Sequence, residues 1–178
     1  YEVFSCARLS KKYYSDVRKL PTLFKVYTIS EKKEQIVTTG GLKVLSDYTI
    51  ANCPKPDILI IPGGLGTRNL IKNSKVISWI KSHSNIDLLA SVCTGSLLLA
   101  KANLLENKKA TTHWGAFSLL KKICPTIQIV KKDRFVYDKY FTSSGVSSGI
   151  DMSLAIIELL YGKVIAKNTA KYMEYYYY

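Results

Sequence analysis

Long hydrophobic runs are missing from this sequence of 178 residues, in which no strictly apolar stretch exceeds four residues. A helix that spans a membrane needs about 20 apolar residues, so we expect no such helix and no membrane partner. Apolar residues still make up 47% of the chain and charged residues 22%. This balance is typical of globular domains and excludes a disordered chain, a collagen and a coiled-coil rod.

Paired metal-binding residues are also missing, because none of the four cysteines belongs to a CxxC pair and there are only two histidines. A structural zinc site needs four close nitrogen or sulfur ligands at regular spacing. We therefore expect no metal site, reduced cysteines and a cytoplasmic protein. The residues concerned are Cys6, Cys53, Cys93, Cys124, His83 and His113.

Acidic residues are few, since the chain has 13 acidic and 26 basic side chains. The formal charge is therefore +13. Such a charge raises the question of a nucleic-acid partner. The lysines, however, come as scattered pairs, and no helix-turn-helix, zinc-finger or RNA-binding aromatic motif is present. The sequence therefore favours a solubilising basic surface and no nucleic-acid partner.

Short β-branched or apolar segments alternate with segments of helical periodicity, which predicts a mostly parallel α/β sandwich. Glycines 40 and 41 predict a hairpin turn, and an amphipathic helix opens the chain. The expected strands are 24–30, 35–39, 42–45, 57–61, 87–92, 110–112, 127–130, 134–137 and 139–142, of which 57–61 is the kind buried on both faces of a parallel sheet. The expected helices are 1–10, 67–82 with Thr67 as its cap, one directly after residue 93, 114–122, 148–160 with Gly162 at its end, and 163–173.

Cys93 lies between the buried strand 87–92 and a helix, with the small residues Ser91 and Gly95 on either side. This is the pattern of a nucleophile elbow, in which the turn lifts the side chain out of the sheet. A helix N-terminus beside the sulfur favours the thiolate. The alternative is a buried, inert cysteine, which suits the other three cysteines better.

The turn after strand 57–61 carries Gly63 and Gly64, which let backbone N–H groups approach an oxyanion; the alternative is a plain tight turn. Ligands of open parallel sheets bind beyond the carboxyl ends of the strands. Thr94 either donates its hydroxyl to a reacting atom or simply begins the helix. His113 lies at another strand-to-helix junction and either lines the site or has a structural role.

Four segments in this order resemble the ThiJ/PfpI superfamily, and within it the isonitrile hydratases and the similar domain fused to AraC-type regulators. They are DILIIPGG (57–64), LLASVCTGSLLLAKANLLENKKATTHW (88–114), FTSSGVSSGIDMSLAIIELLYGK (141–163) and KYMEY (171–175). The resemblance implies a flavodoxin-like three-layer sandwich, a homodimer, Cys93 as nucleophile and an oxyanion site around Gly63 and Gly64. Gly95 and His113 are included in this site.

Members of this superfamily begin with a strand followed by an acidic D-x-x-G-P-x-[ED]-V-F motif, and this sequence begins within that motif at YEVF. The resemblance therefore implies a single domain over 1–178 that lacks its N-terminal strand and the aspartate that acts as catalytic acid. Glu2 matches the second acidic position, near the pocket.

These features predict a cofactor-independent, cysteine-dependent enzyme that hydrates isonitriles, its small-molecule substrates, to N-substituted formamides. Thr94 follows the nucleophile where the peptidase-like members carry histidine, which argues against a peptidase. Two alternatives stay open: a small-molecule sensor without turnover, and a stress-related deglycase or chaperone-like protein.

Overall fold

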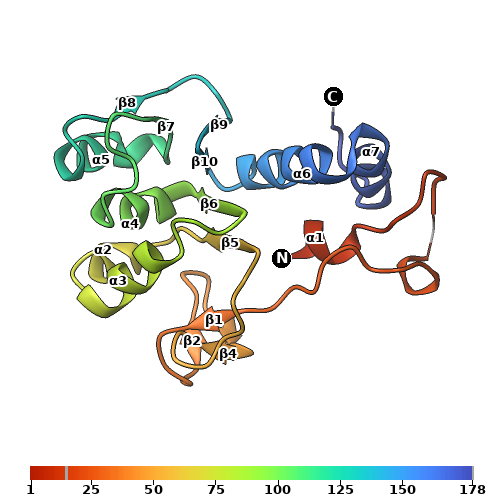
Figure 1. Ribbon diagram of the computed structural model, residues 1–178, viewed down its shortest axis with the longest axis horizontal. Helices are drawn as coiled ribbons and strands as arrows, with labels where there is room; N and C mark the ends of the chain where they lie inside the picture. Colours follow the sequence, from red (N-terminus) through yellow and green to blue (C-terminus); the bar gives the residue numbers. More distant parts are fainter. Residues whose placement is uncertain (15, 178) are drawn as a thin grey trace. The chain divides into compact units, whose positions relative to one another are not determined.

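The computed structural model describes residues 1–14 and 16–177, which form two compact units. The larger unit is Tyr27–Gly149, and the smaller unit joins Tyr1–Val26 to Ile150–Tyr178. Figure 1 labels the helices and strands along the chain.

A four-stranded sheet in the order β5 (Ile58–Ile61), β6 (Leu88–Val92), β10 (Tyr140–Ser143) and β9 (Phe135–Asp138) forms the centre of the larger unit. β5, β6 and β10 are parallel, and β9 runs antiparallel to β10. Ile61 pairs with Ser91, and Ser143 pairs with Val92. The three parallel strands therefore end almost level, and the loops that follow them meet at one edge of the sheet. This confirms the prediction of an α/β fold with a mostly parallel sheet.

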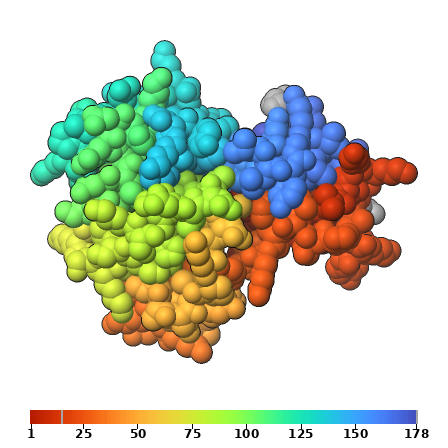
Figure 2. Space-filling model, viewed as in Figure 1, coloured from red at the N-terminus to blue at the C-terminus, as the bar shows by residue number. Residues whose placement is uncertain are grey.

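Short helices pack on this sheet through one apolar cluster. The helical segments are α2 (Thr67–Leu70), α3 (Ser74–Ser82), η2 (Cys93–Gly95), α4 (Ser96–Lys101), η3 (Trp114–Ala116) and α5 (Phe117–Ile123). α4 contacts both α3 and α5 (Figure 1), and Figure 2 shows the side chains of these segments, yellow through green to teal, closely packed. Residues 96–100 of α4 are all buried, as expected of a helix that is apolar on every side. Leu97 and Leu99 pack with Leu59 and Leu89 of the sheet.

Three sequence predictions in this unit need correction. The helix expected over 67–82 is broken, because Asn73 caps α3 instead of continuing α2: its side chain accepts the Val76 N–H at 3.2 Å. Thr67 does not cap the first helix; its hydroxyl donates to the Gly64 carbonyl at 2.8 Å. The strand expected to be buried on both faces, β5, lies at the edge of the sheet, so its residues alternate between half-buried and buried.

Three pairs of two-residue strands complete the larger unit. The hairpin of β2 (Ile36–Val37) and β3 (Lys43–Val44) confirms the expected glycine turn, with Gly41 at φ 85°. β1 (Ile29–Ser30) pairs in parallel with β4 (Tyr48–Thr49), so only the end of the strand expected over 24–30 forms. β7 (Lys109–Ala110) pairs with β8 (Gln128–Ile129).

The smaller unit contains α1 (Glu2–Cys6), η1 (Val17–Lys19), α7 (Lys163–Tyr172) and most of α6 (Ser148–Tyr161). The Phe24 ring contacts Phe4 and Tyr161 edge-on, with ring centroids 5.1 and 5.4 Å apart. Gly162 ends α6 at φ 87°, and its N–H donates to the Glu158 carbonyl at 2.8 Å, as the sequence predicts. Among the described residues, no helix is long and apolar enough to cross a membrane.

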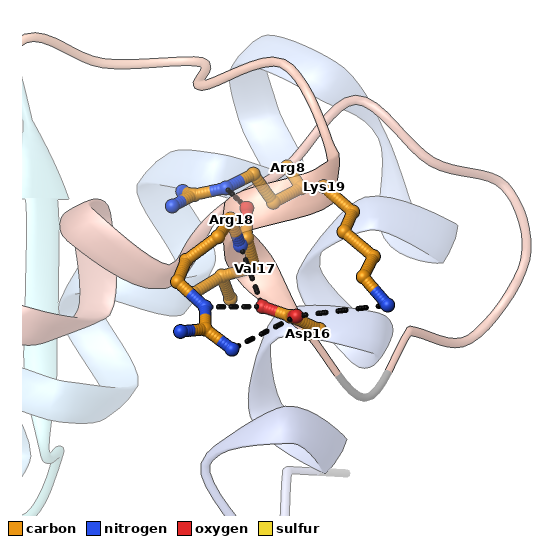
Figure 3. A network of polar contacts seen from close by, with 5 residues as sticks. All are labelled: Arg8, Asp16, Val17, Arg18 and Lys19. Atoms are coloured by element: carbon orange, nitrogen blue, oxygen red, sulfur yellow. Dashed lines mark hydrogen bonds and ion pairs between the residues drawn. The ribbon is translucent and has the colours of Figure 1, made fainter.

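Arginine side chains fix the connection after α1 (Figure 3). The buried Arg8 donates to the carbonyls of Ser5, Ala7 and Val17, which satisfies backbone groups that the short helix leaves open. Asp16 pairs with Arg18 at 2.9 Å. Hydrogen bonds from Arg18 lower the pKa of the Asp16 carboxyl.

Candidate active site

Cys93 directly follows β6 as the first residue of η2, and its φ of 56° lies in the left-handed region. This region is unfavourable for a residue with a side chain and is maintained only where neighbouring contacts impose it. The side chain is half-buried, so it reaches the surface. One 3-10 turn separates it from α4, whereas the sequence predicted an α-helix directly after it. The strand, strained cysteine and helix form the geometry of an elbow.

Gly63 approaches the elbow more closely than any larger residue permits. A Cβ atom on Gly63 would lie 2.8 Å from the Cβ of Cys93 and 2.9 Å from the carbonyl oxygen of Val92. Gly95 is equally confined, because its Cβ would clash with the carbonyl oxygen of Ile61 and lie 2.9 Å from that of Pro62. Both glycines are therefore required by the close approach of the β5 turn to the elbow.

Thr94 joins this turn to the elbow through its hydroxyl. Its Oγ1 accepts the Gly64 N–H at 3.0 Å and donates to the Gly64 carbonyl at 3.1 Å. Gly64 has a φ of 122°, which side chains rarely permit. The hydroxyl is buried and has both its donor and an acceptor site engaged by Gly64, an arrangement that positions the turn.

The loop that carries His113 also reaches the elbow. The Thr112 hydroxyl donates to the Cys93 carbonyl at 2.9 Å, and the Ser96 hydroxyl donates to the same oxygen at 3.1 Å. His113 Nδ1 accepts the Gly115 N–H at 3.2 Å. A Cβ on Gly145 would lie 3.9 Å from Cδ2 of His113, so the loop after β10 meets this ring.

Buried hydroxyl groups lie around the elbow; the sequence reasoning named Ser91 only as a small neighbour of Cys93 and missed Thr111 and Thr142. Ser91, Thr111 and Thr142 are fully buried, and Thr142 Oγ1 accepts the Thr111 N–H at 2.9 Å. Ser91 Oγ and Thr111 Oγ1 have no hydrogen-bond partner among the described residues. The signal was present as serine and threonine in strands that are otherwise apolar, which is unusual for a core.

Carboxylates are absent from the four loop segments that meet at the elbow, residues 62–68, 93–96, 111–116 and 143–149. Glu2 lies in the smaller unit, in the first turn of α1, where its Oε2 accepts from the Cys6 thiol at 3.8 Å. Burial and the nearby Glu2 charge raise the pKa of the Cys6 thiol. The structure thus brings together Gly63, Gly64, Cys93, Thr94 and Gly95, and it joins the loop of His113 to Cys93 through Thr112. The roles of His113 and Glu2 at the site stay predictions. No cluster of three or more potential metal ligands occurs in the described part of the chain.

The model of the DJ-1/PfpI family matches residues 15–159. This chain belongs to the DJ-1/PfpI family. Isonitrile hydratase from Pseudomonas putida is 33% identical over 165 residues, which cover 91% of this chain and 70% of the hydratase. The HTH-type transcriptional regulator GbdR from Pseudomonas aeruginosa is 27% identical, and the match covers 81% of this chain but 39% of the regulator.

Solved structures of the DJ-1/PfpI family share the fold of this chain. A THiJ/PfpI family protein from Pseudomonas syringae superimposes with a TM-score of 0.78 at 28% identity, covering 85% of this chain and 63% of that chain. An AraC family transcriptional regulator from Pseudomonas putida superimposes with a TM-score of 0.75 at 16% identity, covering 97% of this chain and 88% of that chain. The chain thus spans less than two thirds of the first of these structures. These matches confirm the predicted flavodoxin-like fold.

Proposed function

We propose that this protein hydrates isonitriles to N-substituted formamides with Cys93 as nucleophile. The observation that carries the proposal is the left-handed Cys93 at the end of β6, with Thr94 beside it, in a chain 33% identical to isonitrile hydratase. A half-buried sulfur that reaches the surface beyond the carboxyl ends of parallel strands suits a small ligand that approaches from that side.

The reaction adds one water molecule to R–N≡C. The thiolate of Cys93 forms a bond to the terminal carbon, which then takes a proton and becomes a thioimidate, R–N=CH–S. Water adds to this carbon and one of its protons passes to the nitrogen. The tetrahedral product then collapses with cleavage of the carbon–sulfur bond, and its hydroxyl proton returns to the acid that protonated the carbon. The products are R–NH–CHO and the regenerated thiolate.

The surrounding residues have different roles in this proposal. Gly63 and Gly95 allow the close approach that holds Cys93 in its strained conformation. Thr94 and Gly64 position the turn beside the sulfur. The proton that the carbon takes comes from an acid outside the four loop segments or from His113, because those segments contain no carboxylate. The family resemblance assigns this role to the aspartate of its D-x-x-G-P-x-[ED]-V-F motif, whose second acidic position Glu2 matches.

A small-molecule sensor is the second candidate function. The regulators GbdR and CdhR match 81% and 92% of this chain at 27% and 24% identity. A domain similar to this chain therefore also occurs in proteins whose names describe transcriptional regulators. A sensor would retain the ligand-binding edge of the sheet and have no need of the proton donor.

Formamide production from cyclohexyl isonitrile, followed by chromatography with the full-length protein, distinguishes the two functions. We expect turnover by the wild type and by Cys53→Ser, a half-buried cysteine in a loop, and none by Cys93→Ala. Saturable binding of the isonitrile without formamide would replace the hydratase with the sensor. Turnover by Cys93→Ala would refute both the nucleophile and the mechanism.

A further inference from the structure

Large apolar side chains are exposed in three places of the larger unit. Four of them lie on or beside the β2–β3 hairpin, and Tyr137 of β9 stacks on Phe141 with ring centroids 4.2 Å apart. The remaining three, Leu65, Trp114 and Val146, are 63%, 78% and 82% exposed. The hairpin residues are Ile36, Val37, Leu42 and Leu45.

Each of these three residues directly follows a residue of the candidate site. Leu65 follows Gly64, whose N–H donates to Thr94 Oγ1 at 3.0 Å. Trp114 follows His113, and their rings lie 5.1 Å apart.

The third residue, Val146, follows Gly145. A Cβ atom on Gly145 would lie 3.9 Å from Cδ2 of the His113 ring. The three side chains therefore come from three different loops that converge on Cys93.

Apart from Arg68 and His113, the side chains of these loops are apolar or carry hydroxyl groups. No acidic side chain lies in them, and Arg134, which reaches the last loop, donates to the Ser147 hydroxyl at 3.2 Å. Exposed apolar side chains on the loops of a site are one mark of ligand binding.

We propose that Leu65, Trp114 and Val146 form an apolar rim that binds the hydrocarbon substituent of the isonitrile and selects bulky substituents over small ones. The inference rests on the proposed function. An isonitrile is linear through nitrogen, so a molecule whose carbon meets the Cys93 sulfur projects its substituent away from the elbow, toward the loops that carry the rim. Trp114 offers the largest apolar surface of the three and is the main specificity-determining residue.

The first test compares kcat/KM for cyclohexyl and methyl isonitrile in the wild type and in Trp114→Ala. We expect the variant to lose about 10- to 200-fold on the cyclohexyl substrate and to keep its rate on the methyl substrate. Tyr137→Ala, which removes another exposed ring from the same unit, is the matched control and should change neither. An equal loss on both substrates would overturn the proposal, because it would mean that Trp114 maintains the elbow.

A second measurement is independent of turnover and uses the two tryptophans of the chain, Trp79 and Trp114. In Trp79→Phe combined with Cys93→Ser, the fluorescence reports on Trp114 alone. We expect N-cyclohexylformamide to shift this emission saturably to shorter wavelength and N-methylformamide to leave it unchanged. A shift without any isonitrile turnover would refute the hydratase and retain the apolar rim, whereas no shift with either formamide would overturn the rim.

Discussion

Substitution of Gly63 by alanine tests the geometry on which the elbow depends. The new methyl carbon would meet the Cβ of Cys93 at 2.8 Å, the Val92 carbonyl oxygen at 2.9 Å and the Thr94 nitrogen at 3.0 Å. Two of these atoms belong to the backbone and the third is a Cβ, so no side-chain rotation relieves the contacts. Overpacking of this kind costs about 1–3 kcal/mol of unfolding free energy.

Gly66→Ala is the matched control, because nothing lies within 4 Å of its Cβ position and its φ is −58°. Replacing glycine at such a position is neutral or stabilises by about 0.4–1 kcal/mol. A chain of this size changes its melting temperature by about 2–4 °C per kcal/mol. We therefore expect Gly63→Ala to melt about 2–12 °C below the wild type, and Gly66→Ala to melt at or slightly above it.

Thermal unfolding by circular dichroism measures the change in melting temperature. The rate of iodoacetamide alkylation of Cys93 reports whether the elbow has moved. If the elbow moves to relieve the clash, the alkylation rate changes even where the stability loss is small. Equal melting temperatures for Gly63→Ala and Gly66→Ala, together with wild-type alkylation in both, would refute the close approach of the β5 turn to Cys93.

Three further predictions concern thiols, pH and assembly. Cys93 should be alkylated first under brief, limiting iodoacetamide at neutral pH, and Cys6 later, because burial and Glu2 raise the pKa of the Cys6 thiol; peptide mapping gives the order, and earlier labelling of Cys6 contradicts it. Burial and the hydrogen bond to Glu158 raise the pKa of Tyr177 to about 12, so its contribution to stability is complete below about pH 10 and is lost as the pH rises to about 12. Across this pH window the free energy of unfolding, measured with urea, should fall less steeply in Tyr177→Phe than in the wild type. Identical slopes would refute the raised pKa of Tyr177. Light scattering should give the mass of a homodimer, as the family resemblance implies, and the mass of a monomer would refute this prediction.

Local patterns were enough to predict the elbow. Cys93 lies between an apolar run and a helical pattern, with Ser91 and Gly95 as small neighbours, and all of these signals fall within about ten residues of sequence. The strand, the turn and the helix could therefore be assigned without knowing what packs against them. The hairpin at Gly41 and the helix end at Gly162 were found for the same reason.

Contacts between distant segments could not be predicted in this way. The partner of the Thr94 hydroxyl is Gly64, thirty positions earlier in the chain, and the sequence offered no reason to prefer it over a reacting atom. Asn73 interrupts an apolar periodicity that continues on both sides, and its amide also donates to Glu31 at 2.8 Å. The exposure of one face of β5 follows from its place at the sheet edge, which depends on the strand order.

The position of the proton donor separates the two candidate functions more sharply than the elbow does. Thiolate addition to an isonitrile carbon needs only a sulfur at an accessible edge, which Cys93 supplies in either function. Hydration then requires a proton at that carbon, and a general acid contributes about 10²–10⁴-fold to such a step. The loops around Cys93 supply hydroxyls and one imidazole but no carboxylate, and the Thr94 hydroxyl is engaged by Gly64. If neither an acid from outside these loops nor His113 donates this proton, the same elbow would hold the isonitrile reversibly. Reversible binding without turnover is the behaviour of a sensor.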